Sequence, residues 1–237
     1  MTAEQWTHAV RQRLALGRLL PLGGPRDGAW ISEAAAGAVL RRAALEVPGV
    51  RVDALRIAPA HPEDGSEPVV PPPPGALPPG PLRVTAEFAA TAAEPLPATA
   101  ARLRAALGAA ATRLLGPAVT EVDLRVAALL DTEPERTPVA SPRVPEAARP
   151  GTPDEERVTA AVLAVAGVAR LTAGLGCAVH VEERRTRAAG LPHRHVRVEV
   201  AVAADHRAVE VARRVRGAVA GTLPGRPTVT VLVTAVG

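Results

Sequence analysis

Residues 82–130 read LRVTAEFAATAAEPLPATAARLRAALGAAATRLLGPAVTEVDLRVAALL, and this stretch decides the fold. Apolar and polar residues alternate from Leu82 to Phe88, and this period of two predicts a half-buried strand. The leucines between positions 96 and 114 then recur on one side of a helix, which Gly116 and Pro117 end. Alternation resumes over 121–126 and predicts a closing strand.

The same order of elements recurs in residues 196–236. Alternating valines over 196–202 predict a strand, Asp205 can cap the helix that follows, and residues 228–236 predict the closing strand. Each copy is preceded by another helix and another strand. The sequence therefore predicts an α+β fold with two tandem two-layer domains, each with the order helix-strand-strand-helix-strand.

The first copy has clear boundary signals. Ser32 can cap its first helix, and Pro48-Gly49 ends it. The phase of the apolar residues then changes near Asp53-Ala54, which predicts a β-bulge in the next strand. In the second copy, Thr152-Pro153-Asp154-Glu155 is a capping box that predicts a helix start.

The expected organisation has four parts. They are an N-terminal amphipathic arm (1–25), a first domain (26–131) with a proline-rich loop over 58–81, a proline-rich linker (132–151), and a second, more divergent domain (152–237). In the arm, Trp6, Val10 and Leu14 share one side of a short helix, which either docks on a membrane surface or partner or covers its own domain. The proline-rich loop is interpreted as a spacer, with a ligand for a proline-binding domain as the alternative.

Composition narrows the function classes. Every basic residue is arginine, lysine is absent, and the formal net charge is only +4, a bias that a high-GC genome explains. The aromatic content of 1% argues against a basic nucleic-acid surface with stacking aromatics. No signal peptide is visible, and the apolar run 158–169 is shorter than the ~20 residues that cross a bilayer. We therefore expect a cytoplasmic protein that reaches a membrane only peripherally or through a partner.

Few residues suggest chemistry. His180, His193 and His195 form a weak candidate for a metal site, and a polar sheet face is the favoured explanation for them. Cys177 is expected to point into the core, away from these histidines. The serines Ser32, Ser66 and Ser141 lie at a helix cap and in proline-rich segments, and no phosphate-binding glycine motif is present. We expect no catalytic residues, no cofactor and no small-molecule substrate, hence a protein that is not an enzyme.

The segment AAAGAVLRRAALEVPGV, residues 34–50, resembles the opening helix and turn of the bacterial alkaline shock protein (Gls-type) family of envelope stress response proteins. LRVTAEFA at 82–89 and VTEVDLRV at 119–126 resemble strands of that family. The second half matches only in its strand-helix-strand pattern. The resemblance implies a non-enzymatic scaffold protein at the cytoplasmic face of the membrane, with related stress-response proteins and a small membrane-anchored protein as partners, and with possible self-association.

We therefore expect an interaction protein in envelope stress response or homeostasis. The alternative is a nucleic-acid-binding module of KH-like topology, although the GxxG clamp of that fold is absent. The residues expected to make contacts combine the arm with the polar faces of the two sheets. They are Trp6, Val10, Leu14, Arg83, Glu87, Glu121, Arg125, Arg197 and Glu199.

Overall fold

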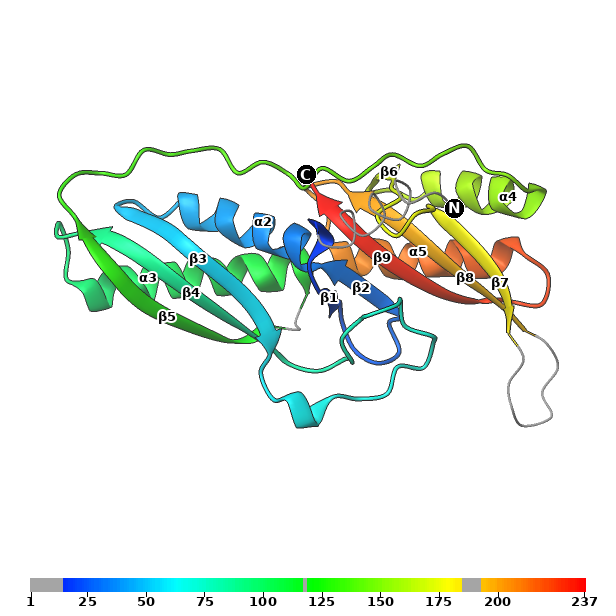
Figure 1. The fold of residues 1–237 in the computed structure, drawn as a ribbon, viewed down its shortest axis with the longest axis horizontal. Coiled ribbons are helices and arrows are strands. Elements are labelled where there is room, and N and C mark those ends of the chain that lie inside the picture. The colour runs from blue at the N-terminus through cyan, green and yellow to red at the C-terminus, as the bar shows by residue number, and fades with distance from the viewer. Residues whose placement is uncertain (1–14, 117–118, 185–192) are drawn as a thin grey trace, which may run out of the picture.

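The structure is a computed structural model that describes residues 15–116, 119–184 and 193–237. Over these residues the protein is a mixed α+β fold with four α-helices and two open sheets. The two sheets lie along the long axis of the molecule, with helices packed against one side of them (Figure 1). None of these helices is long and apolar enough to cross a membrane.

The smaller sheet contains β3 (Val50–Pro59), β4 (Leu82–Thr91) and β5 (Val119–Leu130) in that order. We call it sheet B. β3 is antiparallel to β4, and β5 is parallel to it, because α3 (Leu96–Ala110) and the wider turn η2 (Ala111–Leu115) carry the chain back between them. The predicted bulge is confirmed: the β3–β4 register shifts between Val52 and Ala54. Gly116 ends the helical segment with a φ of 121°, a conformation that favours glycine.

The larger sheet, sheet A, has the order β1-β2-β9-β8-β6, and β7 also pairs with β8. Its strands are β1 (Leu19–Pro21), β2 (Ala29–Ser32), β6 (Val168–Leu171), β7 (Val179–Arg184), β8 (His193–Val202) and β9 (Thr228–Val236). α4 (Pro153–Leu163) precedes β6, and α5 (Ala208–Thr222) connects the parallel strands β8 and β9. β2 pairs in parallel with β9, so a strand from near the start of the described chain lies beside its last strand.

Two of the three helix caps proposed from the sequence are confirmed. Ser32 accepts a hydrogen bond from the backbone N–H of Ala35 at the start of α2 (Glu33–Leu45). Thr152 and Glu155 form the predicted capping box of α4. The prediction for Asp205 is wrong, because α5 begins only at Ala208 and the Asp205 carboxylate lies 2.7 Å from Nδ1 of His206.

α2 connects the two sheets. It leaves β2 of sheet A, contacts β9, and enters β3 of sheet B while packing against α3. All six residues from Ala35 to Leu40 are buried, so the helix has apolar neighbours on nearly all sides. A continuous hydrophobic cluster accordingly includes residues of both sheets, from Phe88 of β4 to Val231 of β9. The predicted boundary at residue 26 falls in the turn between β1 and β2.

The face of sheet A that points away from the helices is covered by irregular chain. A second hydrophobic cluster lies there, formed by Leu16, Leu19, Trp30, Val70, Val144 and Leu232. The proline-rich loop contributes to this cover, since Trp30 Nε1 donates to the carbonyl of Leu77 at 3.0 Å. The linker runs along one side of the molecule (Figure 1) and places the buried Val144 in the same cluster. The loop therefore packs on sheet A as well as joining two strands.

Candidate interaction surface

The outer face of sheet B carries four of the predicted contact residues. Arg83 Nε lies 2.5 Å from the Glu121 carboxylate and 3.4 Å from that of Asp123. Arg125 lies 3.5 Å from Glu87. All are part-exposed, so these ion pairs contribute little to stability and stay available to another charged surface. The structure thus brings together Arg83, Glu87, Glu121 and Arg125 as sequence analysis predicted.

β5 borders this charged face and has an unpaired outer edge in the described structure. It is 12 residues long, and most of its residues from Arg125 onward are exposed. Two of its apolar side chains, Val126 at 39% and Leu129 at 62%, are among the most exposed large hydrophobic residues of the described chain. A long edge strand with apolar side chains is a surface on which another strand can pair.

In sheet A the corresponding edge is covered by another strand. β9, like β5, is the closing strand of a strand-helix-strand unit and runs parallel to the strand before it. Its other edge is occupied by β2, which pairs over Ala29–Ile31 with Val231–Val233. β9 is consequently buried almost throughout, whereas β5 is not. The open edge of β5 is therefore a specific feature of sheet B.

The opposite edge of sheet B is better protected. β3 carries the bulge at Asp53 together with exposed Arg51 and Arg56. The Arg18 side chain also donates to the carbonyl of Ile57. Charges, bulges and covering side chains are the usual means of blocking an edge strand. On β5 one side chain acts in a similar way: Arg104 of α3 donates from Nε to the Val122 carbonyl at 3.2 Å.

The predicted contact residues of the second half do not form a comparable surface. Glu199 is fully buried and the Arg197 side chain is only 15% exposed, so the expectation that both face solvent is wrong. The physical reason is the cover over sheet A, which strand alternation alone does not reveal. Trp6, Val10 and Leu14, the contact residues of the arm, lie outside the described residues.

Glu199 is held under the segment that precedes β7. Its carboxylate accepts hydrogen bonds from the backbone N–H of Leu175 at 3.0 and 3.2 Å, and Arg197 Nε is 3.9 Å away. Burial raises the pKa of Glu199 to about 7 despite these favourable contacts. Cys177 lies on the same side of the sheet, with Sγ 3.8 Å from Arg197, so the expectation that it points the other way is also wrong.

The three candidate metal ligands do not converge. His180 and His195 belong to adjacent strands, but His180 lies opposite Arg197 and His195 lies opposite Glu182. His195 is buried, bonds Thr228 Oγ1 through Nδ1 at 2.8 Å, and has a pKa lowered to about 4 by burial. His193 pairs with Arg184 at the end of the ladder. No group of three or more possible metal ligands occurs among the residues that the structure describes.

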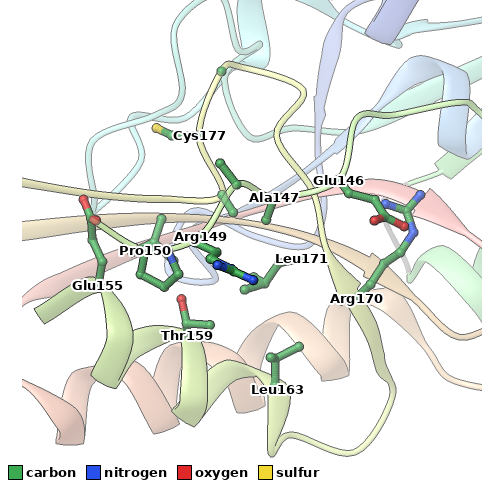
Figure 2. A pocket seen from close by; sticks show the side chains of 14 residues that line it. Glu146, Ala147, Arg149, Pro150, Glu155, Thr159, Leu163, Arg170, Leu171 and Cys177 are labelled. Atoms are coloured by element: carbon green, nitrogen blue, oxygen red, sulfur yellow. The ribbon is translucent and has the colours of Figure 1, made fainter. Parts of the chain in front are cut away.

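A cavity of about 430 Å³ lies between the linker, α4 and the start of β7. Figure 2 shows Arg149 and Pro150 of the linker and Thr159 of α4 around it. The Glu155 carboxylate at its rim accepts hydrogen bonds from the N–H groups of Gly151 and Thr152, at 2.7 and 3.1 Å, so it serves the helix cap.

The thiol of Cys177 also lines this cavity and is labelled in the upper left part of Figure 2. Burial is the largest of the effects that raise its pKa, so the thiol stays protonated at neutral pH. A protonated thiol is a poor nucleophile, and no histidine is among the described residues that line the cavity. The described lining residues therefore do not assemble a nucleophile with its base.

Comparison with known proteins identifies no relative: no family model matches the chain, and no curated protein is significantly similar to it. The surface on sheet B must therefore be interpreted from its own geometry. Sequence analysis missed Arg104, Val126 and Leu129 there. A signal for the last two was present, since alternation breaks down in the apolar run VAALL at 126–130.

Proposed function

We propose that this protein is a non-enzymatic scaffold protein that binds a protein partner along the outer edge of β5. The observation that carries the proposal is the contrast between β5, whose edge is open, and β9, whose equivalent edge is covered by β2. The exposed Val126 and Leu129 supply apolar contact, and the charged outer face beside them supplies specificity.

The order of elements supports the idea of two tandem helix-strand-strand-helix-strand units. α2, β3, β4, α3 and β5 follow one another in the first half, and α4, β6 with β7, β8, α5 and β9 in the second. In both halves the strand before the crossover helix runs parallel to the strand after it. Together with the segment at 34–50, this order favours a divergent relative of the alkaline shock proteins. On that basis we propose a role in envelope stress response at the cytoplasmic face of the membrane, through a membrane-anchored partner.

Leu129→Lys should abolish capture of the specific protein partner from gently solubilised native cells. A lysine at this position places a charge where the partner must bury apolar surface, and an unpaired buried charge is costly. The measurement is affinity capture of the tagged protein, with bound proteins and nucleic acids both identified.

Val69→Lys is the matched control, because Val69 is equally apolar and 68% exposed but lies on the proline-rich loop. If the proposal holds, the native chain and Val69→Lys capture the same protein, and Leu129→Lys does not capture it. Equal capture by all three proteins would contradict a role for the β5 edge. Recovery of RNA without a consistent protein would favour the nucleic-acid-binding alternative.

A further inference from the structure

We propose that β5 of one molecule pairs with β5 of a second copy of this chain. The two strands run antiparallel and the pairing is centred on Leu124, which means that Leu124 lies opposite Leu124 of the second copy. The inference rests on the proposed function, because it names the occupant of the same strand edge. It would join two copies of sheet B into one continuous sheet, with the order β3-β4-β5 followed by β5-β4-β3 of the second copy.

The two faces of sheet B restrict the possible registers. Val122, Leu124 and Val126 pair with the buried residues of β4 and lie on the helix-covered face. Glu121, Asp123 and Arg125 alternate with them and lie on the outer face. Directly opposed residues of an antiparallel pair point to the same side. A register that keeps the helices of both copies on one side must therefore oppose even-numbered residues with even-numbered ones.

Charge then selects among the symmetric registers that remain. Pairing centred on Asp123 opposes Glu121 with Arg125 twice but also brings the two aspartates together, and pairing centred on Arg125 opposes the two arginines. Pairing centred on Val122 opposes Glu121 with Asp123. Only pairing centred on Leu124 forms opposite-charge contacts, Asp123 with Arg125 twice by the two-fold symmetry, without any like-charge contact.

The exposure of these two residues fits such a pairing. The side chain of Asp123 is 61% exposed and that of Arg125 is 78% exposed, so each has room for another partner. Asp123 already contacts Arg83 and Arg125 already contacts Glu87. In the pair, charges would alternate in sign across four strands: Arg83 and Asp123 of one copy, then Arg125 and Glu87 of the second.

The helix-covered face is equally complementary in this register. Leu124 meets Leu124 of the second copy, and Val122 meets Val126. Val126 is 39% exposed in the single chain, so the pairing would remove apolar surface from water. The paired segment ends at the bulge near Ala127, where the β4–β5 register shifts. The interface is therefore short, and we expect a weak dimer whose population depends on concentration.

Arg104 regulates access to this edge. Its Nε donates to the carbonyl of Val122, which lies within the paired segment. A second strand must therefore displace this side chain before it can pair along the whole segment. Arg102 lies on the same helix but forms an ion pair with Glu94, 2.7 Å away, and provides a matched comparison.

The test measures the mass of the purified full-length protein by sedimentation equilibrium over a range of concentrations. Asp123→Arg and Arg125→Asp each create two like-charge contacts in the proposed pair. Each should raise the dissociation constant about tenfold or more. An equimolar mixture of the two variants restores both opposite-charge contacts, so it should associate as the native protein does.

Weakening by both variants, followed by recovery in their mixture, is specific to the register centred on Leu124, because pairing centred on Asp123 would be little changed by Asp123→Arg. A native protein that stays monomeric at every concentration, or a mixture that associates no better than either variant alone, would overturn the inference. If a variant melts too low for use, Arg104→Ala and Arg102→Ala decide the question. Arg104→Ala should tighten the dimer several-fold and Arg102→Ala should not, whereas equal constants for the two would overturn it.

Failure here can be told apart from failure of the proposed function. The native protein could be monomeric while Leu129→Lys still loses the cellular partner. That result would mean that the β5 edge binds a different protein and not a second copy of this chain. Capture that is unaffected by Leu129→Lys would contradict the proposed function but not the pairing, because Leu129 lies beyond the bulge that ends the paired segment.

Discussion

Replacement of Glu199 by Gln should raise the free energy of unfolding at pH 8, while changing it little at pH 4.5. The carboxyl group is fully buried, and burial raises its pKa to about 7 from an ordinary value of 4.5. The unfolded chain therefore releases this proton at lower pH than the folded chain does. The stability that the group contributes is fully present below pH 4.5 and is lost as the pH rises through 7.

The size of this loss follows from the shift in pKa. A shift of this kind corresponds to a loss of roughly 3 kcal/mol once the group is ionised in both states. Glutamine stays neutral and still offers an oxygen to the N–H of Leu175, so the variant should avoid most of that loss. Arg197 offsets the effect only in part, since its Nε lies 3.9 Å from the carboxylate.

His195 acts in the opposite direction. Its folded pKa of about 4 lies below its ordinary value of 6.5, so its contribution is present above pH 6.5 and is lost as the pH falls through 4. Between pH 4.5 and 6.5 the two groups therefore offset each other in the native protein. Denaturant unfolding at several pH values should show stability rising with pH over that range in Glu199→Gln and a flatter profile in the native protein. Parallel profiles would contradict this account.

Phe88→Ala should destabilise the protein by about 4 kcal/mol, the usual cost of removing a fully buried aromatic side chain. Phe88 is the sole phenylalanine of the chain and is fully buried at the centre of sheet B, where it pairs with Val52 and Val126. The hydrophobic cluster that contains it consists mostly of alanine and valine, whose side chains are too short to fill the space it leaves. Thr85→Ala, an exposed position on the same strand, should cost less than about 1 kcal/mol.

The shape of the Phe88→Ala unfolding curve is informative as well. The main hydrophobic cluster runs through both sheets, so we expect a single transition that shifts as a whole. Calorimetry and denaturant unfolding measure this directly. Two transitions, of which the substitution moves only one, would mean that sheet A and sheet B unfold independently.

Local sequence signals predicted much of sheet B. Alternation located β4 and β5, the change of phase near Asp53 located the bulge, and Ser32 located a helix start. These features depend on neighbouring residues, which is why the sequence reveals them. The charged face with Arg83 and Arg125 followed from the same alternation.

Features that depend on distant segments were not predictable in this way. Alternation on β8 indicates that Glu199 lies on one face, but only the folded chain shows that residues near Leu175 cover it. The pairing of β2 with β9 joins segments about 200 residues apart and leaves no local pattern. The openness of the β5 edge is likewise a property of the whole arrangement, because it depends on which edges the other strands occupy.

The most direct test of the open edge is hydrogen–deuterium exchange of Val119–Leu130 compared with Thr228–Val236 in dilute protein. An edge strand leaves alternate amides unpaired, whereas β9 is paired on both sides over Val231–Val233. The account predicts fast exchange in β5, slow exchange in β9, and protection of β5 that grows as the protein is concentrated. Equally slow exchange of the two strands in dilute protein would contradict it.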